Sequence, residues 1–431
     1  MATTKSLKRI YDSQIDVFQS LMLNFEFREP GSSELPVKNK SPKTVIEPFV
    51  VGEIATNRFI NEFWTSKQRQ ANPIHEISYR ACFKPQLPGF FIEHLTKEDD
   101  YVYDPFSGRG TTIIEATLRK RRGIANDINP ISKILASPRL NIPSISEIEN
   151  RLTSIKIESN LKCEIDLSMF YEKNTLHEIL SLRKYLNHQA STGNTDHIDD
   201  WIRMIATNRL TGHSTNFFSV YTLPPNQAMG AEKQKKVNIQ RNQVPEYKDV
   251  KYIILKKSKD LISAISLDTK HILSKYGKHA LFLNEDSRET NQIPDNLVQL
   301  TVTSPPFLDI VQYASDNWLR CWFNNINMED VAKRITMSKN VEQWTAVMRS
   351  VFQQLFRITK PGGWVAFEVG EVRNGKIRLD EYVVPLGTEL GFACIGILIN
   401  QQEFTKTANI WGVSNNSKGT NSNRIVVFRK P

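Results

Sequence analysis

The sequence predicts an α/β fold with a largely parallel sheet and one long helical insertion. Short apolar segments alternate with segments of helical apolar spacing up to residue 140, and the alternation resumes after residue 278. Residues 141–277 break this alternation and are mostly of the helical kind. Forty per cent of the 431 residues are hydrophobic, so a packed core is expected in one large domain with insertions.

Residues 1–74 are expected to form an N-terminal arm. Leu7 to Leu23 has the apolar spacing of an amphipathic helix. Residues 30–48 are rich in Pro, Ser and Lys and predict a loop or linker. The aromatic and basic segment 59–70 is of a kind that touches nucleic acid, but a surface helix packing Phe63 and Trp64 inward is the stronger interpretation.

The most specific local pattern runs from Asp104 to Thr112 and reads Asp-Pro-Phe-Ser-Gly-Arg-Gly-Thr-Thr. An apolar segment, 101–104, precedes it and a helical run, 113–120, follows it. Strand, tight glycine loop and helix together predict the first βα turn of a Rossmann-like sheet. Gly108 and Gly110 let the backbone approach a ligand closely. No Gly-Lys-Ser/Thr follows, which disfavours a nucleoside triphosphate site.

The remaining elements follow from the same patterns. Strands are expected at residues 124–127, 280–283, 300–303 and 364–369, and an antiparallel hairpin at 392–400 and 424–429. Helices are expected at 89–95 and 341–359, and within the insertion at 175–187, 199–210 and 250–266. The sheet domain is therefore expected to comprise residues 75–140 and 278–431, with 141–277 inserted.

Three acids follow expected strands. A carboxylate at Asp104 repels phosphate but suits a cationic amino group, while Asp127 is placed to accept both hydroxyls of a ribose. Asp286 would accept from an adenine amino group. The competing interpretation is three surface aspartates that cap βα turns.

A second motif, Ser304-Pro305-Pro306-Phe307, ends another expected strand about 190 residues later. Consecutive prolines stop a sheet and stiffen the loop, which then presents carbonyls, a hydroxyl and an aromatic face. Such groups suit an exocyclic base amine, whose delocalised lone pair makes it a poor nucleophile: Ser304 and the Pro305 carbonyl would accept its hydrogens. Phe307 would stack on a flipped base. The alternative is a simple Pro-Pro turn.

In this order the two motifs resemble the S-adenosylmethionine-dependent amino-methyltransferases of DNA, over residues 75–140 and 278–431. In that family the glycine motif has the form Asp-Pro-Phe-x-Gly-x-Gly-Thr-Thr. Adenine-N6 members usually carry Asp or Asn before Pro-Pro and cytosine-N4 members Ser, so Ser304 implies cytosine N4. The resemblance implies S-adenosylmethionine as cofactor, with these candidate binding residues: Lys84, Pro85, Asp104, Phe106, Gly108, Gly110, Thr111, Asp127 and Asp286. Catalytic candidates are Ser304, Pro305, Pro306 and Phe307. Lys84-Pro85 is similar to the segment that closes over the methionine moiety, although Pro88 makes that match loose.

The resemblance also implies a site-specific methyltransferase of duplex DNA within a restriction–modification system, with a cognate restriction endonuclease acting on the same site. Three alternatives stay open: adenine N6 as the target, an RNA methyltransferase of the same fold, and a catalytically inactive DNA-binding scaffold.

The insertion is the candidate DNA-recognition region. Lys233 to Lys259 contains nine Lys or Arg against two acids, and the net charge of the chain is +10, which suits a polyanionic partner. The segment also holds residue types that read base edges: Gln227 just before it, then Asn238, Gln240, Arg241, Asn242 and Gln243. A solvated loop and a charged helix face explain the same residues equally well.

Composition excludes several other classes. No apolar run reaches 18 residues and the N-terminus has no signal core, so we expect a cytoplasmic protein without a membrane span. The four cysteines and eight histidines show no ligand spacing, so we expect free thiols and no metal.

Overall fold

The computed structural model describes residues 15, 17–25, 44–64, 71–80, 82–222, 228–306, 313–335, 338, 340–372, 376–401 and 422–431. Within these residues nine strands form one sheet in the order β1-β2-β10-β11-β7-β6-β3-β4-β5. They are β1 (Val45–Val51), β2 (Ile54–Asn61), β3 (Tyr101–Asp104), β4 (Arg122–Asn126), β5 (Leu281–Leu283), β6 (Val298–Thr303), β7 (Thr359–Val369), β10 (Ala393–Gln401) and β11 (Ser422–Arg429). A separate two-stranded ribbon pairs β8 (Glu371–Val372) with β9 (Ile377–Arg378).

The centre of the sheet is parallel, as the sequence predicts. Strands β5, β4, β3, β6 and β7 are parallel to one another, and β11 then pairs antiparallel with both β7 and β10. The predicted hairpin at the C-terminus is therefore confirmed. The α/β fold with a Rossmann-like sheet is confirmed as well.

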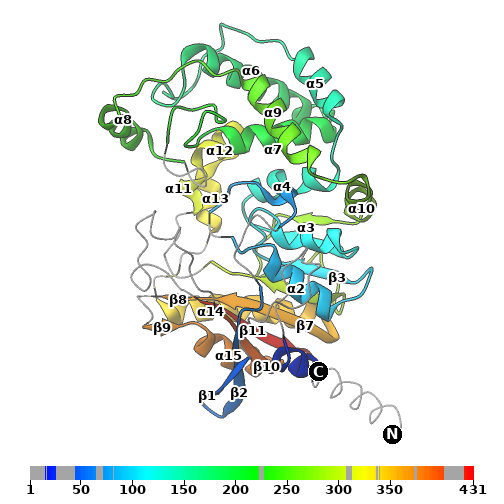
Figure 1. The fold of residues 1–431 in the computed structure, drawn as a ribbon. Helices are drawn as coiled ribbons and strands as arrows, with labels where there is room; N and C mark the ends of the chain where they lie inside the picture. The colour runs from blue at the N-terminus through cyan, green and yellow to red at the C-terminus, as the bar shows by residue number, and fades with distance from the viewer. Residues whose placement is uncertain are drawn as a thin grey trace, which may run out of the picture.

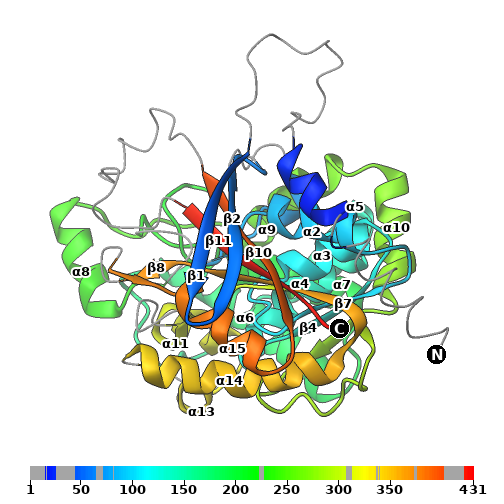
Figure 2. The ribbon, with the colours of Figure 1, turned by 90° about the horizontal axis from the view of Figure 1, so that it is seen from below.

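The N-terminal arm contributes to this sheet. β1 and β2 form an antiparallel hairpin, and β2 pairs parallel with β10, so the arm extends the sheet at its edge (Figure 2). The predicted surface helix from residue 59 is wrong, because β2 continues to Asn61; residues 65–70 lie outside the described part. Phe63 and Trp64 do pack inward, 2% and 4% exposed. Residues 17–23 are helical, in agreement with the amphipathic spacing.

Helices cover both faces of the sheet. Val102 and Tyr103, adjacent in β3, point to opposite faces and belong to different core clusters. One cluster includes side chains of α14 (Val341–Ile358) and α15 (Asp380–Glu389); the other includes α2 (Gln86–Leu95) and residues 17–23. Helix α3 (Thr111–Leu118), which follows the glycine loop, packs against α2 and β4.

The insertion forms a helical block at one end of the molecule (Figure 1). Its helices are α5 (Ile145–Ser154), α6 (Lys173–Ser191), α7 (His197–Arg209), α8 (Ala231–Gln240), α9 (Val250–Ser263) and α10 (Leu267–Gly277). Helix α4 (Ile131–Ala136) and the short 3₁₀ turns η2 (Pro73–His75) and η3 (Ser137–Leu140) lie outside residues 141–277. The three helices predicted in the insertion are confirmed as α6, α7 and α9. α10 contacts α3 and β4, so it belongs to the layer over the sheet.

A second segment joins the helical block. Helices α11 (Tyr313–Asp316), α12 (Trp318–Phe323) and α13 (Met328–Arg334) lie beside the helical block in Figure 1, and α12 contacts α7. Arg183 of α6 donates to the Trp322 carbonyl at 3.0 Å and stacks on its ring. Among the described residues, no helix is both long enough and apolar enough to cross a membrane.

Candidate active site at the carboxyl edge of the sheet

The candidate site lies where the strand order reverses. β3 pairs with β4 on one side and with β6 on the other, so successive connections leave the sheet in opposite directions. Open α/β sheets bind ligands in the crevice outside the carboxyl ends of strands at such a point. The glycine loop follows β3 and the Ser-Pro-Pro loop follows β6, so this topology brings both predicted motifs to one place.

The glycine loop needs its glycines at two positions. Gly108 and Gly110 have φ values of +51° and +80°, which L side chains rarely adopt. A Cβ on Gly110 would lie 2.3 Å from the Cβ of Ala136 in α4, and one on Gly108 would meet the ring of Tyr79 at 3.4 Å. Thr111 then begins α3, where it is 2% exposed. The loop is thus a close-packed cradle whose backbone faces the crevice.

Asp127 holds this loop in place. Its carboxylate accepts from the Gly108 amide at 2.8 Å and from the Asn129 amide at 2.9 Å. Burial raises the pKa of Asp127, and the two backbone donors oppose that rise. The side chain lines the cavity described below, at the end of the strand next to β3.

Asp104 lies deeper, 1% exposed. It accepts from the Thr303 hydroxyl at 2.7 Å and from the Phe106 amide at 3.1 Å, so it connects the ends of β3 and β6. Burial raises its pKa to about 6, against the opposing effect of these hydrogen bonds. Asp104 is not among the residues that line the cavity, whereas Phe106 is.

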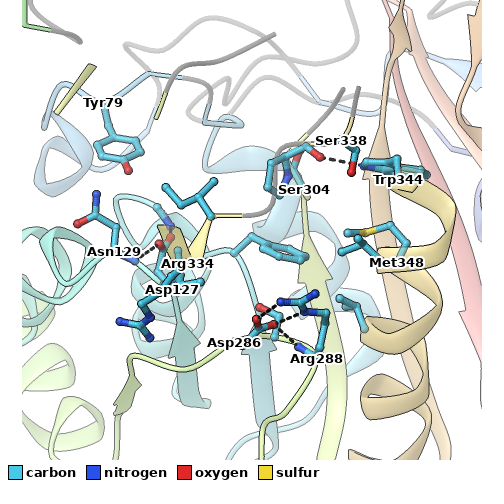
Figure 3. Close-up of a pocket in the computed structure, with 18 residues that line it drawn as sticks. Tyr79, Asp127, Asn129, Asp286, Arg288, Ser304, Arg334, Ser338, Trp344 and Met348 are labelled. Carbon is cyan, nitrogen blue, oxygen red and sulfur yellow. Dashed lines mark hydrogen bonds and ion pairs between the residues drawn. The ribbon is translucent and has the colours of Figure 1, made fainter. Parts of the chain in front are cut away.

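Asp286 forms an ion pair inside the crevice. Its two oxygens accept from Nε of Arg288 at 2.9 Å and from Nη2 at 2.5 Å (Figure 3). The guanidinium lowers the pKa of Asp286. Both side chains line the cavity and remain partly exposed.

The Ser-Pro-Pro loop, which follows β6, forms another part of the crevice wall. Ser304 and Pro306 are half-buried and line the cavity, while Pro305 is buried. The Pro306 carbonyl accepts from the Trp344 indole at 2.9 Å. Phe307 lies outside the described residues.

One cavity therefore joins the two motifs. Its wall includes six residues of the predicted set: Phe106, Gly108, Asp127, Asp286, Ser304 and Pro306. The sequence analysis missed the other lining residues: Tyr79, Ile128, Asn129, Ser287, Arg288, Arg334, Ile335, Ser338, Trp344, Val347, Met348 and Val351. Figure 3 shows Tyr79 on one side of this cavity and Trp344 on the other.

Only some of the missed residues carry a signal in the sequence. Asn129 and Arg288 each follow a predicted acid by two residues, and the same turn that presents the acid presents them. Arg334 and Trp344 belong to helices α13 and α14 and reach the crevice only through packing.

Lys84 and Pro85 lie at the start of α2, with Pro85 as its N-cap. Burial lowers the pKa of Lys84. Neither residue is among those that line the cavity. The structure thus places them beside the sheet domain without bringing them into the crevice.

In the insertion, several candidate base readers have contacts within the protein. Asn238 accepts from Gln234 at 2.7 Å and from Gln243 at 2.8 Å, and it donates to the Met169 carbonyl at 2.8 Å. Arg241 stacks on Tyr221 with its guanidinium carbon 3.8 Å from the ring centre. Gln240 and Asn242 are exposed, and Gln227 lies outside the described residues.

Comparison with known proteins gives a family match over the part of the chain that contains the glycine loop. A family model described as DNA methylase matches residues 33–136, which contain β3, the glycine loop and β4. The type II methyltransferase M.MjaII of Methanocaldococcus jannaschii is 28% identical over 88 residues, 20% of this chain and 17% of that protein. The chain therefore spans well under two thirds of this relative.

Two of the solved structures to which this chain is similar come from Thermus thermophilus and Methanosarcina mazei. TrmN from Thermus thermophilus is 12% identical with a TM-score of 0.30, over 82% of this chain and 50% of that one. A SAM-dependent methyltransferase from Methanosarcina mazei is 10% identical with a TM-score of 0.32, over 79% of this chain and 96% of that one.

The sheet order and the crevice define a protein of the α/β class that has a Rossmann-like sheet with a ligand crevice at its carboxyl edge. Within that class, the family match supports the N4/N6 DNA methylases, with S-adenosylmethionine as cofactor. It does not distinguish cytosine N4 from adenine N6.

Proposed function

We propose that this chain transfers a methyl group from S-adenosylmethionine to the exocyclic N4 amine of cytosine in duplex DNA. The observation that carries the proposal is the shared cavity: Gly108 of the glycine loop and Ser304 of the Ser-Pro-Pro loop line the same crevice. A methyl donor on one side would then meet an amine on the other, which is the positioning that a direct displacement requires.

The residues at the crevice fit the cofactor. Gly108 brings the backbone of the glycine loop to the cavity wall, while Gly110 lets the loop pack against Ala136 of α4. The adjoining acids, Asp127 and Asp286, suit ribose hydroxyls and an adenine amine respectively. Asp104 is our candidate for the ammonium group, with Phe106, Thr111 and the Lys84-Pro85 segment as further candidates. When bound, the cofactor supplies an electrophilic methyl group on a sulfonium.

The Ser-Pro-Pro loop supplies acceptors. The Ser304 hydroxyl and the Pro305 carbonyl would accept the amine hydrogens and so favour tetrahedral nitrogen as positive charge develops. Held by these acceptors, the amine would be aligned with the methyl group that the bound cofactor would supply, and the proton that the nitrogen gives up on methylation would pass to solvent. No covalent bond between protein and base is required. Phe307 would stack on the flipped base.

Cytosine is proposed on one residue, because Ser304 stands where adenine-N6 enzymes of the resembling family usually carry an acid or an amide. The insertion is the proposed DNA-recognition region, and a cognate restriction endonuclease is the proposed functional partner. The insertion is proposed on the basic character of residues 233–259, and the endonuclease on the resemblance.

The test is transfer of tritiated methyl groups to duplex DNA and, in parallel, to RNA, followed by mass spectrometry of the nucleosides. N4-methylcytosine in DNA is expected. N6-methyladenine would reject the base assignment, and label in RNA alone would reject DNA as the substrate. Cofactor binding without any transfer would favour the scaffold.

Ser304→Ala tests the acceptor role. Removal of an interaction made mainly in the transition state should lower kcat while cofactor affinity stays near that of the wild type. An unchanged kcat would remove Ser304 from the proposed chemistry.

A further inference from the structure

The Ser-Pro-Pro loop has no backbone donors of its own at its two prolines. Pro305 and Pro306 lack N–H groups, so neither can be held by a hydrogen bond from its own amide. The loop must be held through its carbonyls, its side chains or its flanks. Residues 304–306 carry the groups proposed to touch the base, so what holds them matters to the reaction.

Two side-chain hydrogen bonds hold the loop, one at each end. At its beginning, the Thr303 hydroxyl donates to Asp104 at 2.7 Å. At its end, the indole Nε1 of Trp344 donates to the Pro306 carbonyl at 2.9 Å. Ser304, which lies between these two hydrogen bonds, lines the same cavity as Trp344 (Figure 3).

The position of Trp344 is set by its helix and by the hydrophobic core. It lies in the first turn of α14, whose N-cap Asn340 accepts from the Gln343 amide at 2.9 Å. Its side chain is 2% exposed and belongs to the core cluster under the sheet. The same helix contributes Met348 and Val351 to the cavity wall. An indole fixed by the core can therefore fix the loop that it contacts.

We infer that Trp344 is a positioning residue: its indole N–H holds the Pro306 carbonyl and thereby sets the position of the Ser304 and Pro305 acceptors. This inference rests on the proposed methyl transfer for its catalytic consequence. The hydrogen bond orients the loop, and the indole ring separately forms part of the cavity wall.

Two substitutions of Trp344 distinguish the effect of the indole N–H hydrogen bond from the effect of ring packing. Trp344→Phe keeps an aromatic ring but removes the donor. Trp344→His loses the six-membered ring, yet its Nε2 occupies the ring position of the indole Nε1 and can carry a proton. If the hydrogen bond positions the loop, the His variant retains more activity than the Phe variant; if only packing matters, the order reverses.

The expected loss in Trp344→Phe is about three- to tenfold in kcat, the factor for one hydrogen bond of ordinary strength. S-adenosylmethionine affinity by calorimetry should change less than kcat does. Trp201→Phe is the matched control, since it removes an indole hydrogen bond of the same length, 2.9 Å to Ser258, in the insertion core away from the cavity. It should leave kcat unchanged.

Hydrogen exchange of the peptide spanning Thr303 and Ser304 gives a readout that needs no methyl transfer. Exchange should rise in Trp344→Phe and stay closer to wild type in Trp344→His. Equal exchange in the wild type and the Phe variant, or a Phe variant more active than the His variant, would overturn the inference. A wild-type protein that binds cofactor but methylates nothing would instead overturn the proposed function, and exchange would still decide whether Trp344 holds the loop.

Discussion

The carboxyl edge of the sheet and the helical insertion both carry many polar side chains, but they use them differently. At the sheet edge, Asp127, Asp286 and Ser304 line a cavity. In the insertion, Asn238 and Gln243 bond to each other and to the backbone. A polar residue after a parallel strand is thus placed at a crevice by topology, whereas a polar residue on a helix depends on what packs beside it.

The two regions are connected through the segment that contains α12 and α13. Asn324, after α12, donates to Thr207 of the insertion at 2.9 Å. At the other end of this segment, Arg334 of α13 donates to the Asn284 carbonyl at 2.8 Å, and Asn284 donates to the Asp127 carbonyl at 2.6 Å. The chain that follows the Ser-Pro-Pro loop therefore contacts the helical block before it returns to the crevice.

The largest expected difference in stability between the two regions concerns two glycines with positive φ, one in each region. Gly110→Ala at the sheet edge combines backbone strain with a clash against Ala136, whereas Gly193→Ala between α6 and α7 has φ +71° and no atom within 4 Å of the new Cβ. We expect a loss of about 2–5 kcal/mol for Gly110→Ala and about 1–2 kcal/mol for Gly193→Ala. Urea unfolding measures both. Equal losses would show that the cradle relaxes easily.

The second prediction concerns Asp104 and pH. Its pKa of about 6 in the free protein means that much of the carboxylate is protonated at pH 5. A cationic ammonium would favour the charged form, so cofactor affinity should rise about tenfold from pH 5 to pH 7 and level off above that.

Asp104→Asn keeps an acceptor for Thr303 but removes this charge. At pH 8 the variant should bind S-adenosylmethionine at least about tenfold more weakly, and its affinity should not vary over pH 5–7. A pH-independent wild-type affinity in calorimetry would exclude Asp104 as the ammonium partner.

The third prediction concerns the amide cluster of the insertion. Asn238→Ala removes one of two acceptors from Gln234 and from Gln243, which keep the Tyr221 carbonyl, and removes the Asn238 donor from the Met169 carbonyl. Stability should therefore fall by about 1–3 kcal/mol without a change in base preference. Gln240→Ala, on the exposed side of the same helix, is the control for stability and should be nearly neutral. Altered sequence preference in the Asn238 variant, measured by sequencing methylated DNA, would restore it as a base reader.

The smallest expected effect concerns the exposed lysines of α8. Replacing Lys233 and Lys236 by Gln should reduce the slope of log affinity for DNA against log salt by about 0.9 for each phosphate that the protein no longer neutralises. Lys97→Gln with Lys120→Gln, exposed at the opposite, amino edge of β3 and β4, is the matched control. Identical slopes in all three proteins would place DNA binding outside this helix.

The sequence by itself determined the parts of this protein that depend on neighbours in the chain. The glycine turn between β3 and α3 and the amphipathic helix α14 follow from local conformational preference and apolar spacing. The acids and the Ser-Pro-Pro loop could be placed at one edge because parallel strands end on the same side of a sheet.

Tertiary structure decided the remaining features, because each of them depends on packing between residues that are far apart in the sequence. β2 joins the sheet by pairing with β10, more than 300 residues away, whereas the sequence predicted a helix over residues 59–70, which overlap the end of β2. Asp104 is buried because β6 brings Thr303 against it. Trp344 reaches Pro306 because core packing sets the position of α14, and no spacing in the sequence relates the two residues.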